Sequence, residues 1–201
     1  MKKLMVLLVA SLISLLIVFA GASCKPEAKL AEPYKIGVVN CTTGWLGAFG
    51  VPQVDGIRLG AEVNNRAGGI KGHPVEIYFF DGESKADVCA RMTRKLIEAD
   101  KVDVMIGPNF TPGIAAMAPI VNQAQVPMMK FGGYVVDTKK DPWVFSMGSD
   151  NFRMAEGMVE YYKKKGGTKI AFMCVKNAFG EEFLKGYQDY MVRYPEMKAL
   201  G

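Results

Sequence analysis

The sequence predicts an α/β fold made of two doubly wound lobes with mainly parallel sheets, the second of them incomplete. Between residues 35 and 108, three short apolar stretches alternate with two amphipathic ones, in the order strand, helix, strand, helix, strand. Glycine and proline residues stand at the ends of these stretches, where turns are expected. Strands that alternate with helices over short connections favour parallel pairing through right-handed crossovers.

The first lobe is expected to span residues 34–145 and to lack its C-terminal return segment. Its first strand is apolar nearly throughout, as in strands that are covered on both faces. Its second helix carries Val88, Met92 and Leu96 on one face at helical spacing. Gly68 suits the end of the first helix, and Pro112 suits the first turn of the third. The expected strands are 35–39, 75–80, 102–106 and 126–131, and the expected helices are 52–66, 84–99 and 112–125.

A second lobe is expected to begin at residue 149. Asp150 could cap a helix that ends at Gly166-Gly167, and a buried strand over 169–175 and a helix over 181–194 follow. One strand and two helices cannot close a sheet, so the second lobe, 149–201, is interpreted as truncated. The alternative is a small single domain with a decorated C-terminus.

The N-terminus resembles an export signal covering residues 1–23. Two lysines precede an apolar stretch over 4–20, and small residues follow it. Two other interpretations of this segment are possible. An ordinary signal peptidase could cleave after Ala22, or the segment could stay uncleaved as a membrane anchor. We favour a lipoprotein signal, because residues 21–24 resemble a lipobox with glycine at the usual aliphatic position. Cys24 would then be acylated and tether the protein to a membrane through residues 24–33.

Composition excludes several classes of function. The chain has 25 basic and 20 acidic residues, without a basic stripe interleaved with aromatic residues, so no nucleic-acid partner is expected. Cys41, Cys89 and Cys174 show no C-x-x-C spacing and are predicted to be buried, inert thiols. We therefore expect neither a metal site nor a disulfide framework.

Enzymatic motifs are also missing from the sequence. Gly44, Gly47 and Gly50 are spaced G-x-x-G-x-x-G, which does not match the dinucleotide-binding fingerprint. The single histidine, His73, precedes a proline in a turn, where a structural role is favoured. Neither G-x-S-x-G nor H-E-x-x-H occurs. We expect no catalytic residues, no cofactor and no enzymatic activity.

Several short motifs follow one another along the chain in a fixed order. They are Thr43-Gly44, Gly68-Gly69-Ile70-Lys71-Gly72, Phe80-Asp81, Lys95-Leu96-Ile97, Ile106-Gly107-Pro108 and Asn177-Ala178-Phe179-Gly180. Together these motifs resemble the branched-chain amino acid binding proteins of ABC importers. This resemblance implies a type I periplasmic binding protein fold, like that of leucine-binding proteins, in which two lobes close over a ligand and deliver it to permease subunits in the membrane. It also implies a periplasmic or cell-surface location. Asp141-Pro142-Trp143-Val144-Phe145, with Thr111-Pro112, also resembles a subgroup that binds aromatic and other small carboxylates.

The resemblance also implies a set of ligand-binding residues. Phe110 and Thr111 fall in the loop that opens the third helix, and the Thr111 hydroxyl is matched to the ligand carboxylate; the alternative for it is a plain helix cap. Two aromatic residues are matched to the walls of the side-chain pocket, although core packing is an alternative for Phe49. The full expected set is Phe49, Phe110, Thr111, Gly132, Gly133, Tyr134 and Phe179.

Two further expectations concern the ligand and the role. Lys130 could pair with a ligand carboxylate, but a solvated lysine at the strand end is favoured. The resemblance places the family's acidic partner for a ligand amine beyond residue 201. The ligand could therefore be either an amino acid or a simpler carboxylate. The same lobes could instead form the ligand-sensing extracellular domain of a chemoreceptor or sensor kinase.

Overall fold

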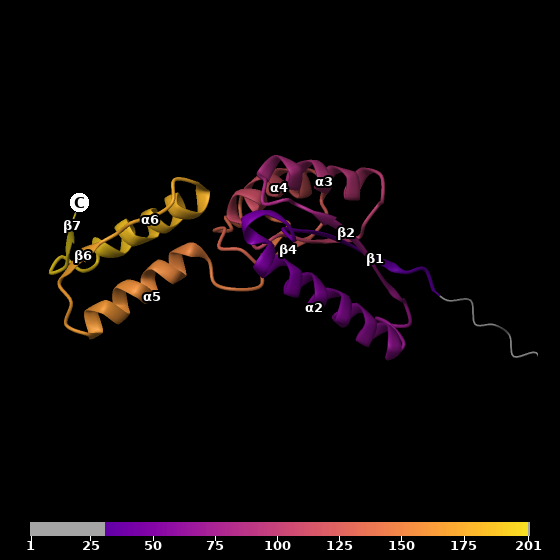
Figure 1. Ribbon diagram of the computed structural model, residues 1–201, viewed down its shortest axis with the longest axis horizontal. Helices are drawn as coiled ribbons and strands as arrows, with labels where there is room; N and C mark the ends of the chain where they lie inside the picture. The colour runs from indigo at the N-terminus through magenta and orange to yellow at the C-terminus, as the bar shows by residue number, and fades with distance from the viewer. Residues whose placement is uncertain (1–30, 201) are drawn as a thin grey trace, which may run out of the picture. The chain divides into compact units, whose positions relative to one another are not determined.

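The computed structural model describes residues 31–200 (Figure 1). Within this range no helix is both long enough and apolar enough to cross a membrane. The expected signal peptide over 1–23 and the acylation of Cys24 lie outside the described residues. The elements are β1 (Tyr34–Asn40), η1 (Gly44–Leu46), α2 (Gly47–Arg66), β2 (Val75–Asp81), α3 (Ala86–Glu98), β3 (Val104–Ile106), α4 (Thr111–Ala124), β4 (Met128–Lys130), β5 (Val144–Ser146), α5 (Asn151–Lys164), β6 (Lys169–Ala171), α6 (Ala178–Met191) and β7 (Lys198–Leu200).

The larger sheet has five strands in the order β2-β1-β3-β4-β5, and every pair in it is parallel. The central strand β1 pairs with β2 on one side, placing Ile36 opposite Ile77, and with β3 on the other, placing Val38 opposite Ile106. All carboxyl ends of these strands therefore lie along one edge of the sheet. The predicted α/β class with a parallel sheet is confirmed.

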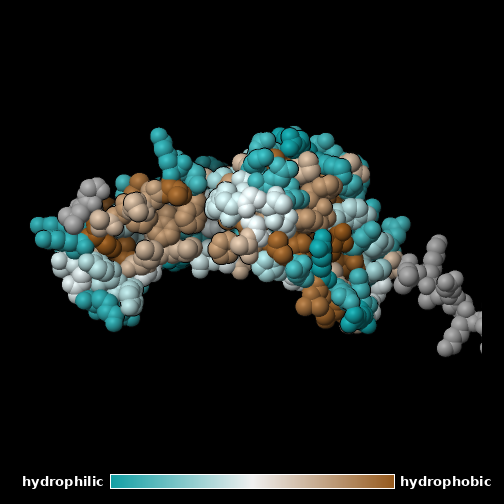
Figure 2. Space-filling view, viewed as in Figure 1, coloured by the Kyte–Doolittle hydropathy of each residue, from teal (hydrophilic) through white to brown (hydrophobic). Residues whose placement is uncertain are grey.

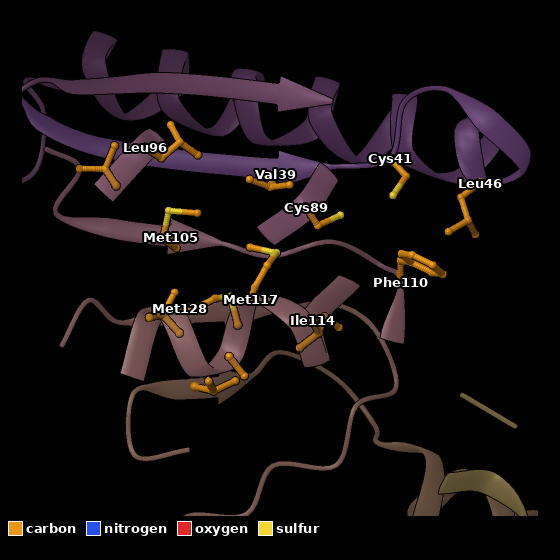
Figure 3. Close-up of a cluster of buried hydrophobic side chains, with 14 residues drawn as sticks. Val39, Cys41, Leu46, Cys89, Leu96, Met105, Phe110, Ile114, Met117 and Met128 are labelled. Carbon is orange, nitrogen blue, oxygen red and sulfur yellow. The ribbon is translucent and has the colours of Figure 1, made fainter. Parts of the chain in front are cut away.

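Helices cover both faces of this sheet. Figure 1 shows α3 and α4 side by side over one face and α2 over the other. Apolar residues of α3 and α4 pack on the sheet and form the main core (Figure 3). Because both faces are covered, the central strands have buried side chains on either side, which explains their unbroken apolar sequence. The buried members of this core include Val39, Leu96, Met105, Ile114, Met117, Val121 and Met128.

The start of one helix and the presence of one strand in the first lobe differ from the sequence expectation. Helix α2 begins at Gly47 and includes Pro52, which was expected to start it. Proline in the second turn gives up only one backbone hydrogen bond, to the carbonyl four residues earlier, so the helix can extend further back. Strand β5 was not predicted, because its three residues follow a polar turn and Phe145 and Ser146 are exposed.

A second, smaller core is formed by α5 and α6. As predicted, Asp150 caps α5, and its carboxylate accepts a hydrogen bond of 2.8 Å from the amide of Arg153. The core residues come from facing sides of the two helices and the segment that follows. The core includes Ala155, Val159, Phe183, Tyr187, Tyr190 and Met197. The division into two lobes near residues 145–149 stays a prediction.

The prediction of a buried strand over 169–175 was wrong. Strand β6 spans only Lys169–Ala171 and is largely exposed, and it pairs in parallel with β7, a strand that was not predicted. A strand with one neighbour in the described chain has little sheet around it to bury its side chains. Cys174, which was predicted to be buried, follows the end of β6 and is exposed, whereas Cys41 and Cys89 are buried as expected.

Apolar residues are also exposed along α2, where Figure 2 shows hydrophobic surface. Leu59 and Val63 are more than half exposed, while Gly50 and Val54 form the buried face of the helix. Helix α2 thus carries apolar side chains both toward and away from the sheet.

Candidate functional site

A cavity of about 580 Å³ lies beyond the carboxyl ends of β1, β3 and β6. In parallel α/β sheets this edge is the usual position of ligand sites. The volume lies within the range of small-molecule pockets. Three loops form its walls, and apolar side chains predominate among its lining residues, which are Trp45, Leu46, Asn109, Phe110, Thr111, Pro112, Val175, Asn177 and Phe179.

The N-terminus of α4 provides the polar end of this cavity. Thr111 is the first residue of the helix and is 3% exposed, and its hydroxyl finds no hydrogen-bond partner within residues 31–200. Phe110 stands at the cap position, so no described side chain caps the helix. Pro112 has no N–H, which leaves the amides of Thr111 and Gly113 beside the hydroxyl. These donors, together with the helix dipole, suit a small anion.

Thr111 does not act as a plain helix cap, which was its alternative role. A capping side chain belongs to the residue before the first helical one, and Thr111 lies inside the helix. A buried hydroxyl without a partner costs free energy, because it gives up its hydrogen bonds to water. A ligand oxygen could restore that lost bond.

Asn109 is a second polar group in this wall, and it was not among the ligand-binding residues expected from the sequence. Its amide N–H donates a bond of 3.4 Å to the side-chain oxygen of Asn40, which is fully buried at the end of β1. The side-chain oxygen of Asn109 is itself buried and has no partner among the described residues. Asn40 is fixed in turn by its own bond of 2.9 Å to Gln53. The loop after β3 is thus anchored to β1. The side-chain oxygens of Asn109 and Thr111 nevertheless have no hydrogen-bond partner among the described residues.

The N-terminus of α6 also reaches the cavity, but its amides are already used. The Asn177 side chain accepts hydrogen bonds from the amides of Phe179, at 3.0 Å, and Gly180, at 3.3 Å. A helix end with its own cap offers less to an anion than an uncapped one. Of the two helix N-termini at this cavity, that of α4 is therefore the better candidate for binding an anion.

Aromatic side chains form the apolar end. The rings of Trp45 and Phe110 meet edge to face, with centroids 5.8 Å apart. Phe179 lies in the first turn of α6, and its ring centroid is 6.0 Å from that of Phe183 in the smaller core. Tryptophan and phenylalanine walls favour an apolar or aromatic ligand group. Phe110, Thr111 and Phe179, three of the expected residues, therefore lie around one cavity.

Phe49 does not line this cavity. Its side chain is 64% exposed, which also excludes core packing, its alternative role. The cause is the phase of α2: Gly50 packs so closely on the backbone carbonyl of Cys41 that no β-carbon fits there, and the adjacent Phe49 therefore points elsewhere. Trp45 is the aromatic residue of this segment that reaches the cavity. A role for Phe49 in binding stays a prediction.

The loop that carries Trp45 is fixed by Asp81 and Ser84. The Asp81 carboxylate accepts bonds from the Thr43 hydroxyl, at 2.6 Å, and from the Thr42 amide, at 3.0 Å. Although burial acts to raise it, these hydrogen bonds lower the pKa of Asp81. The Ser84 hydroxyl donates to the Thr43 carbonyl at 2.9 Å and accepts from the Leu46 amide at 3.2 Å. The wall is therefore organised before a ligand arrives.

The loop after β4 lies away from this cavity. Gly133 is in tight contact with the Asn151 side chain. The Gly133 carbonyl also accepts a hydrogen bond of 2.8 Å from the backbone N–H of Asn151. Tyr134 donates a bond of 2.9 Å to Asp141 and borders a separate cavity of about 430 Å³. Burial and the bond to Asp141 raise the pKa of Tyr134. Ligand contacts by Gly132, Gly133 and Tyr134 stay predictions.

Lys130 is not the solvated lysine that was expected. Its side chain is fully buried at the end of β4, and its ammonium group donates a bond of 2.8 Å to the Gly132 carbonyl. Burial lowers its pKa, although the carboxylates of Asp150 and Glu182 act in the opposite direction. Lys130 supports the loop rather than lining the cavity.

No metal centre is evident in the described part of the chain, where no three histidine, cysteine, aspartate or glutamate side chains are grouped to hold an ion. The cavity offers hydrogen-bond donors and aromatic walls instead.

Comparison with known proteins agrees with this geometry. A sequence profile of the family described as periplasmic binding protein matches residues 33–194. The chain therefore belongs to the periplasmic binding protein family, and the relatives below include members of the branched-chain amino acid type. The resemblance predicted from the sequence is confirmed. Members of this family act outside the cytoplasm, which gives the protein an extracytoplasmic location.

One relative by sequence is the Leu/Ile/Val-binding protein homolog 3 of Brucella melitensis biotype 1. It is 31% identical over 157 residues, which cover 73% of this chain and 40% of that protein. The chain thus spans less than half the length of this relative.

Two solved structures show the same fold with ligands bound. One is the branched-chain amino acid transporter substrate binding protein LivJ of Streptococcus pneumoniae in complex with isoleucine, with a TM-score of 0.71 and 23% identity over 79% of this chain and 46% of that one. The other is an ABC transporter solute binding protein of R. palustris in complex with 4-hydroxybenzoate, with a TM-score of 0.71 and 22% identity over 84% and 46%. The chain spans about half the length of both.

Proposed function

We propose that this chain is the ligand-capturing part of a solute receptor for an ABC importer, and that its ligand is a hydrophobic amino acid or a related small carboxylate. The ligand carboxylate binds at the N-terminus of α4, and its apolar group lies between Trp45, Phe110 and Phe179. The receptor hands the ligand to permease subunits and performs no catalysis.

The observation that carries this proposal is the uncapped start of α4 beside an aromatic wall. Thr111 brings a buried hydroxyl without a partner among the described residues, and the helix brings free amides and a favourable dipole. The aromatic rings lie on the other side of the same cavity. A molecule with a carboxylate at one end and an apolar group at the other complements both features.

The relatives support this ligand class and leave it broad. The R. palustris protein was solved with 4-hydroxybenzoate and the S. pneumoniae protein with isoleucine. Both ligands combine a carboxylate with an apolar group. The three aromatic walls of this chain lead us to propose that an aromatic carboxylate binds more tightly than an aliphatic amino acid.

The test compares ligands that differ only in the carboxylate. 4-Hydroxybenzoate is titrated against 4-hydroxybenzamide, and isoleucine against isoleucinamide. Trp45 lies in the cavity wall, so its fluorescence reports occupancy once the other tryptophan is removed by Trp143→Phe. Saturation by the acids and a loss of at least tenfold in affinity for the amides are expected, because a hydrogen bond to a charged group contributes about 1.5–3 kcal/mol.

Equal affinity for acid and amide would contradict the placement of the carboxylate at α4. Absence of binding by every acid in the panel would contradict the ligand class. The chain spans about half the length of its relatives. The same titration on a chain extended to their full length is therefore the matched control for ligand contacts made by further residues.

Anchoring and delivery are further parts of the proposal. Acylation of Cys24 would hold the receptor at the membrane surface, where its permease lies. A mass measurement of the N-terminal peptide from source cells tests this, since an acylated Cys24 is expected as its first residue. An N-terminus at Ser23 would indicate ordinary cleavage instead.

A further inference from the structure

Two buried thiols meet beneath the wall that carries Trp45. Cys41 directly follows β1 and Cys89 lies in α3, and both are fully buried and free. A β-carbon at Gly82 would lie 2.6 Å from the sulfur of Cys89 and 3.4 Å from that of Cys41. The two sulfur atoms therefore border one small space, and Figure 3 shows the side chains directed toward each other.

The two thiols also affect each other's ionisation. Their interaction lowers the pKa of Cys41 and raises that of Cys89. The Cys89 thiol donates a hydrogen bond of 3.9 Å to the Gly82 carbonyl, so it lies beside the same space that Cys41 borders. A disulfide would require the two sulfur atoms to move to about 2 Å from each other. The space between them is kept open by glycine at position 82, because any larger residue there would displace the Cys89 sulfur.

We propose that Cys41 and Cys89 form a disulfide bond when the chain folds in its extracytoplasmic compartment. Disulfides form and persist in such compartments. The oxidant is a disulfide-bearing protein or small molecule. The Cys41 thiolate attacks one sulfur atom of the oxidant, forms a mixed disulfide with it and expels the other sulfur as a thiol. The Cys89 thiolate then attacks the Cys41 sulfur of this mixed disulfide and releases the second oxidant thiol. Both cysteines lose a proton, the pair loses two electrons, and the oxidant leaves as two thiols.

Burial sets the timing of this step. Because both sulfur atoms are inaccessible in the folded chain, the exchange takes place during folding, and the finished bond is shielded from reductants. The bond would tie the end of β1 to α3. The loop that begins at Thr42 carries Trp45, so the disulfide would also fix the start of the loop that forms this cavity wall. The identity of the ligand does not enter this inference, so its failure would leave the proposed function standing.

The test uses the full 201-residue chain with Cys174→Ser, which removes the exposed thiol. The reduced, unfolded chain is refolded in parallel with oxidised and reduced glutathione or with dithiothreitol, alkylated, digested and mapped by mass spectrometry. In the glutathione sample a peptide pair joined through Cys41 and Cys89, lighter by two hydrogen atoms, is expected. Recovery of both cysteines in alkylated form, or linkage of either one to Cys24, would overturn the proposal.

The melting temperature gives a second readout. The disulfide closes a loop from residue 41 to 89, and a loop of this length is expected to raise the Tm by on the order of 5–15 °C. The glutathione sample should melt higher than the dithiothreitol sample. In a Cys41→Ala/Cys89→Ala variant of the same background the two samples should melt together. Equal melting of the two samples in the parent background would contradict a stabilising staple.

Discussion

The side-chain amide of Asn151 donates a hydrogen bond of 2.9 Å to the carboxylate of Glu182, joining the start of α5 to α6. Asn151 is fully buried and also contacts Gly133 of the loop after β4. One asparagine therefore links three segments that are distant in sequence. The carboxylate it holds is itself partly removed from water.

This environment makes folding stability depend on Glu182 ionisation. Burial raises the pKa of Glu182, although the bond from Asn151 and the charge of Lys130 act to lower it. With a higher pKa in the folded state, the folded chain binds more protons than the unfolded one, so this group's contribution to stability falls as pH rises from about 4.5 through the raised value. Glu182→Gln removes that contribution. The stability of the parent relative to the variant should therefore decline across this interval.

Urea unfolding at a series of pH values measures this difference. Glu181→Gln, an exposed neighbour on the same helix, is the matched control and should leave the pH dependence of the parent unchanged. Parallel curves for the parent and Glu182→Gln would show that Glu182 is solvated in the folded chain.

Two glycines of α2 should respond oppositely to alanine. At Gly50 a β-carbon would overlap the backbone carbonyl of Cys41, which cannot move without shifting β1. Gly50→Ala should therefore destabilise the chain by about 1–3 kcal/mol. At Gly56 the structure places nothing within 4 Å of a β-carbon, so Gly56→Ala should stabilise the helix by about 0.5–1 kcal/mol. Urea unfolding separates the two, and equal effects would contradict the close packing of α2 on β1.

Much of the fold was predictable because it rests on local patterns. The apolar strands, the helical spacing of Val88 and Leu96, and the Asp150 cap are properties of neighbouring residues, and each appears where expected. Elements that depend on distant partners were missed, as β5 was. Strand β6 was predicted too long and too buried, because burial depends on how many neighbours a strand has.

The candidate site divides in the same way. Phe110 and Thr111 were expected at a strand end followed by a helix start, and this pattern is local. Trp45 was missed because its loop is held by hydrogen bonds to Asp81 and Ser84, which are distant in the sequence. No periodicity in the sequence reports those bonds. The burial of Lys130, whose ammonium group bonds to the Gly132 carbonyl, is likewise a tertiary property that the local sequence does not report.

Thr111→Val separates the stability of the chain from its ligand binding. Valine keeps the shape of threonine and removes a buried hydroxyl that has no partner among the described residues, so stability should rise by about 1 kcal/mol. Affinity for a carboxylate ligand should fall about tenfold or more, because the hydroxyl bond is lost. Thr111→Ser keeps the hydroxyl and should bind within a fewfold of the parent. Unchanged affinity in the valine variant would remove Thr111 from the site.

Trp45→Ala and Phe49→Ala decide which aromatic residue of this segment contacts the ligand. The family resemblance predicts weaker binding for Phe49→Ala, whereas the cavity is lined by Trp45. Both side chains are more than 60% exposed, at 68% for Trp45 and 64% for Phe49, so neither substitution should change stability by more than about 0.5 kcal/mol. A difference in affinity can then be assigned to ligand contact. Calorimetry with 4-hydroxybenzoate should show a loss of about tenfold for Trp45→Ala and little change for Phe49→Ala. The reverse order would mean that the ligand approaches α2 from outside the cavity, and the wall assigned here to Trp45 would then belong to Phe49.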